Sequence, residues 1–173
     1  MPGYILTGAP GVGKTAILRL LEVNGHVVVD EAATDAIALD KALGHEEPWH
    51  EHAFIDKVVA LQLQRQNSMF FLDRSPVCTL ALSHYLGFAP SRLLTEEVDR
   101  VVAEGVYETT VFFIRKQGFV QTTAARRISF KDVFEQLHEQ TYRDFGFLLV
   151  EVPAGPLTER ATLIEQTVER LRR

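Results

Sequence analysis

The residue types with the clearest chemistry lie near the start of the chain, where residues 8–15 read Gly-Ala-Pro-Gly-Val-Gly-Lys-Thr. They match the pattern G-x-x-x-x-G-K-[ST] at every fixed position, and an apolar run precedes them. Glycines let main-chain amides approach phosphate oxygens, the lysine brings a positive charge to the β- and γ-phosphates, and the threonine hydroxyl can bind Mg²⁺. The motif predicts binding of a nucleoside triphosphate with Mg²⁺, through contacts at Gly8, Ala9, Pro10, Gly11, Val12, Gly13, Lys14, Thr15 and Ala16. No Asn/Thr-Lys-x-Asp guanine motif is found, which favours ATP over GTP.

Two acidic sites at the ends of apolar runs are candidates for the carboxylate that binds the metal ion. One is Asp30-Glu31 and the other is Asp73. In kinase-like P-loop sheets the strand order is 2-3-1-4-5, so the third strand along the chain lies beside the strand that leads into the phosphate loop. On that topology Asp73 and Thr15 are the expected Mg²⁺ residues, and Asp73 acts through water because Mg²⁺ keeps several of its waters.

The other acidic site then faces the phosphoryl acceptor. Glu31 is expected to orient or deprotonate the acceptor, with Asp30 as the second candidate; the alternative is an acid that stabilises the first turn of a helix. Arg74 follows Asp73 directly, and its guanidinium can clamp a phosphate with two donors. A surface ion pair is the alternative for Arg74.

Basic residues are concentrated in one window. Residues 115–131 contain five of the 18 Lys+Arg and none of the 23 Asp+Glu. This predicts a short basic lid over about residues 116–129 that covers the nucleotide and presents Arg126 or Arg127 to the developing charge. A small RNA-binding patch is the alternative, although the window has few aromatic residues.

The segment between the second and third expected strands occupies the usual place of the acceptor pocket. Trp49 and Phe54 could stack on a ring, and Gln62, Gln64 or Gln66 could bond to its edge. Simple core packing is the alternative for most of this helix.

The remaining elements must bring these groups to one edge of a sheet. Strands are expected at Tyr4–Thr7, His26–Asp30, Met69–Leu72, Thr109–Ile114 and Phe147–Val150. Helices are expected at Lys14–Val23, Glu31–Leu43, Ala53–Gln66, Val77–Leu86 and Thr95–Glu104, with two more marked by Phe130, Phe134, Leu137 and Phe145 and by Leu157, Ala161, Ile164, Val168 and Leu171. This alternation predicts a three-layer α/β fold with a five-stranded parallel sheet in the order 2-3-1-4-5. Its strand ends would open on one crevice, where ligands bind.

Composition fits one globular domain over residues 1–173. Hydrophobic residues make up 46% and charged residues 24%, and the net charge of −5 argues against a general nucleic-acid surface. A single cysteine, Cys78, excludes an intrachain disulfide and a cysteine-based zinc cluster. No apolar run spans a bilayer and no signal peptide is recognised, so we expect a cytoplasmic monomer or homodimer with no membrane partner.

Several of these segments together resemble a known family. They are Gly8–Thr15, Val29–Ala33, Phe71–Ser75, Arg126 with Ile128–Phe130, and Tyr142–Val152 followed by Pro153–Gly155. In this order they look like the NadR-like AAA domain of P-loop ATPases and kinases, over essentially the whole chain. The resemblance implies a nucleoside- or nucleotide-kinase-type fold, an Asp-Arg motif at Asp73-Arg74 and a lid bearing Arg126. It also implies a base-contacting loop at Pro153, Ala154 and Gly155.

The sequence therefore predicts an enzyme, a small-molecule kinase that transfers the γ-phosphoryl group of Mg-ATP to a nucleoside-like or other small metabolite. The expected catalytic residues are Lys14, Glu31, Asp73, Arg74 and Arg126. The alternative is an ATP-hydrolysing switch that has no small-molecule acceptor.

Overall fold

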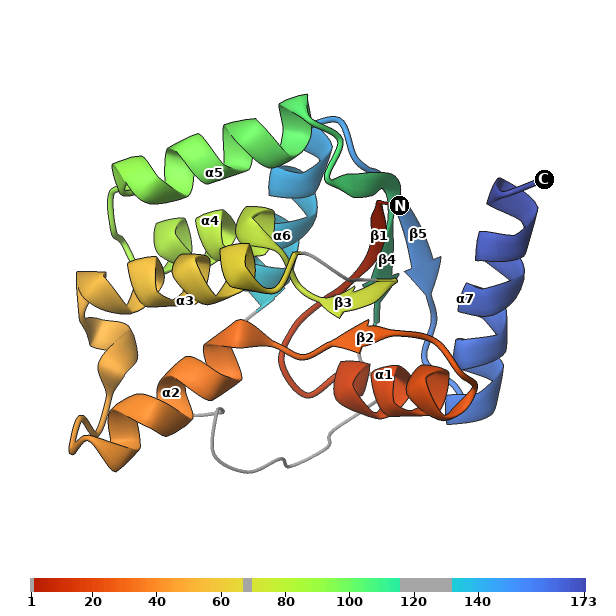
Figure 1. Ribbon diagram of the computed structural model, residues 1–173, viewed down its shortest axis with the longest axis horizontal. Helices are drawn as coiled ribbons and strands as arrows, with labels where there is room; N and C mark the ends of the chain where they lie inside the picture. Colours follow the sequence, from red (N-terminus) through yellow and green to blue (C-terminus); the bar gives the residue numbers. More distant parts are fainter. Residues whose placement is uncertain (1, 67–69, 116–131) are drawn as a thin grey trace.

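A five-stranded parallel sheet forms the centre of the molecule (Figure 1). The computed structural model describes residues 2–66, 70–115 and 132–173. The strands are β1 (Gly3–Thr7), β2 (Val28–Val29), β3 (Phe71–Asp73), β4 (Tyr107–Ile114) and β5 (Leu148–Val152). They lie in the order β2-β3-β1-β4-β5, and each neighbouring pair is parallel. The predicted fold class and strand order are confirmed.

Helices cover both faces of the sheet (Figure 1). The helices α1 (Lys14–Val23) and α7 (Leu157–Leu171) pack on one face. The other face carries α2 (Ala32–Ala42), α3 (His52–Gln64), α4 (Pro76–Tyr85), α5 (Arg92–Ala103) and α6 (Asp132–Asp144), and a single 3-10 turn (Pro48–His50) precedes α3. Among the described residues, no helix combines the length and the apolar character that crossing a membrane requires.

Successive side chains of β1 enter opposite cores. Tyr4 and Leu6 pack with α1 and α7, whereas Ile5 packs with the helices of the other layer. All five residues of β1 are buried, as expected for a central parallel strand with both faces covered. This strand therefore fixes the start of the phosphate loop within the core.

The buried face of α6 differs in part from the one predicted. Phe134, His138 and Tyr142 are fully buried, whereas Leu137 and Phe145 are only half-buried. Phe130 lies outside the described residues. The helix is therefore held to the sheet by a mixed aromatic and polar face rather than by an apolar stripe alone.

Candidate functional site

The phosphate loop connects β1 to α1. Gly13 has φ +92 and caps α1, so that the helix begins at Lys14 and its first amides are free to bind an anion. The Lys14 side chain is 5% exposed, and its Nζ donates to the carbonyl oxygens of Gly8 at 3.3 Å and Ala9 at 3.2 Å. Burial lowers the pKa of Lys14, and Arg74 adds to this, while Asp73 and Glu31 oppose it. The lysine charge is thus held inside the loop and balanced by nearby carboxylates.

The first glycine of the loop is needed for close backbone packing. Gly8 has φ +135, and a Cβ atom there would lie 2.4 Å from the carbonyl oxygen of Ile114 in β4. We expect Gly8→Ala to lower the free energy of unfolding by about 3 kcal/mol or more, because it combines a backbone clash with a strained conformation. Urea denaturation measures this loss.

Gly44→Ala is the matched control for that experiment. Gly44 also has a positive φ of +92, but nothing lies within 4 Å of its added Cβ. The control should cost only about 1 kcal/mol, from backbone strain alone. Equal losses in the two variants would contradict the importance of the Gly8–Ile114 approach.

Arg160 of α7 holds the phosphate loop by a hydrogen bond to its main chain. Its Nη1 donates to the carbonyl oxygen of Val12 at 2.9 Å, and its Nη2 donates to that of Arg115 at 2.9 Å. The side chain is 3% exposed. The role of Arg160 could not be predicted from the sequence, because one arginine on an amphipathic helix gives no signal of a partner 148 positions away.

Arg115, the first basic residue of the predicted window, is a structural cation. Its guanidinium bonds to Glu135 at 2.9 Å, Glu139 at 3.2 Å and Glu151 at 2.5 Å, and lies over the Phe113 ring. It ties α6 to the ends of β4 and β5. The rest of the predicted lid, with Arg126 and Arg127, lies outside the described residues.

Asp73 ends β3 beside β1, where it is in register with Leu6. Its carboxylate is 5% exposed, and Oδ1 has no hydrogen-bond partner among the described residues. Burial raises the pKa of Asp73 to about 6, although Lys14 acts in the opposite direction. The buried Asp73 oxygen without a partner and the exposed hydroxyl of Thr15 at the start of α1 are both oxygen donors of the kind that Mg²⁺ prefers. In the described parts of the chain no group of three or more His, Cys, Asp and Glu is placed to hold a metal, and Mg²⁺ often relies on one or two carboxylates with phosphate and water.

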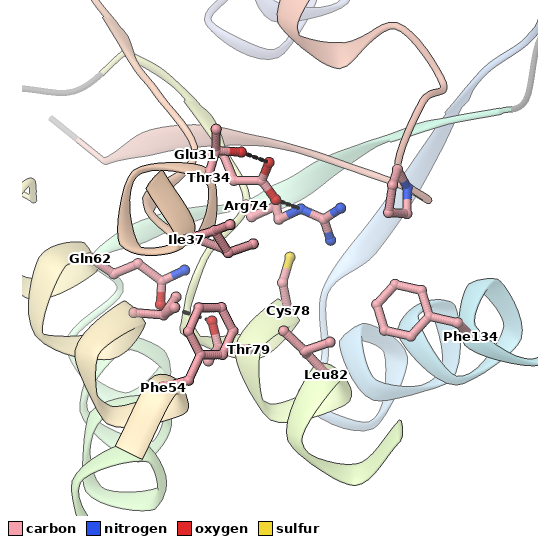
Figure 2. Close-up of a pocket in the computed structure, with 13 residues that line it drawn as sticks. Glu31, Thr34, Ile37, Phe54, Gln62, Arg74, Cys78, Thr79, Leu82 and Phe134 are labelled. Carbon is pink, nitrogen blue, oxygen red and sulfur yellow. Dashed lines mark hydrogen bonds and ion pairs between the residues drawn. The ribbon is translucent and has the colours of Figure 1, made fainter. Parts of the chain in front are cut away.

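Glu31 and Arg74 form an ion pair at the carboxyl end of the sheet (Figure 2). Arg74 Nε lies 2.5 Å from Glu31 Oε1, and Thr34 Oγ1 donates to Glu31 Oε2 at 2.8 Å. Burial would raise the pKa of Glu31, but Arg74 and Lys14 outweigh it and the pKa is lowered. Arg74 also has φ +70, a strained backbone conformation for a non-glycine residue that often marks a functional site.

Asp30, the second candidate for the acceptor side, has a different environment. Its Oδ2 accepts from Arg19 Nη2 of α1 at 2.8 Å, and both side chains are about half exposed, 48% for Asp30 and 50% for Arg19. The structure therefore brings Glu31, and not Asp30, to Arg74.

A pocket opens next to this ion pair. Figure 2 shows side chains from α2, α3, α4 and α6 around it, including Ile37, Phe54, Gln62, Leu82 and Phe134. The pocket is open to solvent on one side, and Pro10 of the phosphate loop is part of its lining. Its mainly apolar wall with a few polar groups is typical of a small-molecule site.

Only some of the aromatic and amide residues proposed for the pocket line it. Phe54 lines it, and Gln62 does so with its Oε1 accepting from Thr79 Oγ1 at 3.0 Å. Trp49 is 3% exposed and packs in the core instead of lining the pocket. The Gln66 amide is bonded to Glu97, Tyr107 and Arg100, and Gln64 is exposed.

A buried polar cluster links the end of β1 to α4 and α6. It consists of Thr7, Ser75, Cys78, His138 and Tyr142. Thr7 Oγ1 is 2.8 Å from His138 Nε2 and 3.2 Å from Cys78 Sγ, and the Tyr142 hydroxyl is 2.8 Å from both Cys78 Sγ and Ser75 Oγ. Burial lowers the pKa of His138 well below its ordinary value, so the ring is neutral. The cluster joins β1, α4 and α6 where the phosphate loop begins.

Residues 153–155 follow β5, at the same edge of the sheet as the phosphate loop. Pro153 and Ala154 are exposed and Gly155 is half-buried, and α7 starts two residues later. The segment is open to solvent, and its predicted contact with a nucleotide base stays a prediction.

Comparisons with known proteins agree with the fold described above. A family model described as an AAA domain matches residues 3–160. No curated protein matches the chain. Similar solved structures include a thymidylate kinase from Candida albicans, with 12% identity, a TM-score of 0.54 and coverage of 99% of this chain and 93% of that one. A deoxyadenosine kinase from M. mycoides with bound products dCMP and dCDP has 14% identity, a TM-score of 0.52 and coverage of 98% and 99%. These structures share the fold of this chain.

Proposed function

We propose that this chain, which belongs to the AAA domain family, is a kinase that acts on a small molecule. It transfers the γ-phosphoryl group of Mg-ATP to a nucleoside-like or other small metabolite. The P-loop kinase-like fold, with five parallel strands between two helical layers, supports this proposal.

The observation that carries the proposal is the pocket beside the phosphate loop. Pro10 of the loop, the Glu31–Arg74 pair and the Phe54 ring contribute to one lining. An ATPase switch needs only water as the attacking group, whereas an apolar pocket with aromatic and amide side chains suits a ring-containing metabolite. The position of the pocket next to the loop would place such a metabolite within reach of the transferred group.

The residues at the end of β1 and β3 bind the phosphates and the metal in this proposal. Lys14 and the loop amides hold the phosphate oxygens, and Thr15 and Asp73 hold Mg²⁺. Bound Mg²⁺ neutralises negative charge on the phosphate oxygens. Asp73 gains a partner for its unpaired Oδ1 in this way.

Glu31 and Arg74 act on the acceptor side. The Glu31 carboxylate, whose lowered pKa keeps it ionised, accepts a hydrogen bond from the acceptor and orients it. Arg74 steadies Glu31 and offers its remaining guanidinium donors to the transferred group. Arg126 and the loop Pro153–Gly155 stay in the proposal as further contacts to ATP.

Acceptor-dependent ATP turnover tests the proposal. We expect at least one compound from a panel of nucleosides, sugars and small alcohols to raise ADP formation about 10-fold or more, with a phosphorylated product detected by mass spectrometry. Calorimetry with ATP and GTP in the presence of Mg²⁺ gives the nucleotide preference. Slow hydrolysis that no acceptor stimulates would reject the kinase and favour the ATP-hydrolysing switch.

A further inference from the structure

Ser75, the residue directly after Arg74, is the N-cap residue of α4, but its side chain does not cap the helix. A serine at this position usually accepts a hydrogen bond from an amide of the first helical turn. Instead, Ser75 Oγ lies 2.8 Å from the hydroxyl of Tyr142 in α6, and both residues are buried. The serine hydroxyl therefore links α4 to α6.

This link lies beside the strained backbone of Arg74. An arginine with φ +70 keeps that conformation only where the surrounding structure holds it. The Arg74 amide donates to the carbonyl oxygen of Leu6 in β1 at 2.9 Å. The bond between Ser75 and Tyr142 holds the next residue from the side of α6. The strained turn is thus held from two directions.

The Tyr142 hydroxyl also connects this turn to the start of the phosphate loop. It lies 2.8 Å from Cys78 Sγ, which lies 3.2 Å from Thr7 Oγ1, and Thr7 immediately precedes the loop. In a buried chain of this kind a polar group that loses its partner finds no substitute, so each contact constrains its neighbours. Main-chain and side-chain contacts together form a closed ring through Ser75, Tyr142, Cys78, Thr7, Leu6 and Arg74.

His138 supports Tyr142 from the preceding turn of α6. The two rings are stacked, with centroids 5.8 Å apart and an interplanar angle of 17°. His138 Nε2 lies 2.8 Å from Thr7 Oγ1. Two neighbouring side chains of α6 therefore contact both the end of β1 and the turn that follows Arg74.

We infer that Tyr142 is a positioning residue that acts through Ser75 to hold the backbone of Arg74, and so directs the Arg74 guanidinium to Glu31 and the acceptor pocket. The inference rests on the proposed kinase function, in which Arg74 contacts the transferred group. Tyr142 is not part of the described lining of the pocket. Its loss should therefore affect the transfer step and leave the binding of nucleotide almost unchanged.

Tyr142→Phe tests the inference, because it keeps the ring and removes only the hydroxyl. Turnover is measured with Mg-ATP and the compound of the acceptor panel that most stimulates ADP formation by the wild type. We expect kcat at saturating Mg-ATP and acceptor to fall about 30-fold, because a small misplacement of a group that acts on the reaction is costly. Calorimetry should give a Kd for Mg-ATP within about threefold of wild type.

The possible outcomes separate the inference from the kinase function. An unchanged kcat in Tyr142→Phe, with a wild type that an acceptor stimulates, would overturn the inference and leave the kinase function in place. Weaker Mg-ATP binding at an unchanged kcat would also overturn it, since Tyr142 would then act on the phosphate loop. A wild type that no acceptor stimulates would reject the kinase function and the inference with it.

Ser75→Ala removes the other half of the same hydrogen bond. The Ser75 side chain makes no cap bond, so this change takes no hydrogen bond from the start of α4. We expect kcat to fall about 30-fold in Ser75→Ala and by no more than that in the double variant with Tyr142→Phe, because the two residues act through one bond. A double variant that loses the product of the two effects, about 1,000-fold, would show that they act separately and would contradict the inference.

Thr141→Val is the matched control for loss of a buried hydroxyl from α6. Thr141 is 6% exposed, and its Oγ1 donates to the carbonyl oxygen of Leu137 in the same helix at 2.7 Å. We expect kcat within about twofold of wild type, because this bond does not reach Ser75 or β1. A fall as large as that of Tyr142→Phe would mean that general loosening of α6 lowers kcat, and would overturn the role of the bond to Ser75.

Discussion

Lys14→Ala is expected to weaken Mg-ATP binding by about 30-fold to several thousand-fold, the range that corresponds to losing one partner of a buried charged interaction. The Lys14 charge is buried in the phosphate loop, where its own partners are the carbonyl oxygens of Gly8 and Ala9. Phosphate oxygens are far stronger partners for an ammonium group than these carbonyls. The variant should therefore lose nucleotide affinity and turnover together.

The fold should survive this substitution. The loop is also held by Arg160 and by the close contact of Gly8 with β4, and neither contact involves Lys14. Circular dichroism should give a native spectrum and cooperative melting, while the increase in melting temperature caused by Mg-ATP should disappear. Lys41→Ala, at an exposed lysine of α2, is the control and should bind ATP as wild type does. Unchanged ATP affinity in Lys14→Ala would show that this loop is not the nucleotide site.

Features that depend on local sequence were predictable. The phosphate-loop motif placed the helix at Lys14–Val23, and the structure has the same bounds. The place of Asp73 beside β1 followed from the strand order, because parallel crossovers leave few arrangements open. Patterns that repeat along one element, and rules that limit how elements connect, are visible without coordinates.

Features that depend on contacts between distant residues were not predictable. Arg160 meets the phosphate loop across 148 positions, and His138 meets Thr7 across 131. A histidine or an arginine on an amphipathic helix looks the same whether its partner is water or a buried backbone carbonyl. Trp49 and Phe54 were both expected at the pocket, and only Phe54 lines it. Both are aromatic residues of one segment, and the sequence alone does not tell that Trp49 is buried in the core away from the pocket.

Glu31→Gln is expected to lower the rate of acceptor phosphorylation by about 100-fold or more, the usual contribution of a general base, with ATP affinity within about twofold of wild type. The amide oxygen can still accept from Arg74 Nε, and the amide NH2 can donate to the Thr34 hydroxyl, so the pocket keeps its shape. The negative charge that draws on the acceptor proton is lost. Steady-state kinetics on the acceptor and calorimetry with Mg-ATP separate the two effects.

Asp30→Asn is the matched control, since it makes the same chemical change one position earlier in the chain. Asp30 is bonded to Arg19 on an exposed surface, so its loss should leave acceptor phosphorylation close to wild type. If Glu31→Gln instead weakens Mg-ATP binding, Glu31 serves the metal and Asp73 does not act alone there. If Asp30→Asn is the variant that loses activity, the two neighbouring acids have the opposite roles, and the Glu31–Arg74 pair only stabilises the end of the sheet.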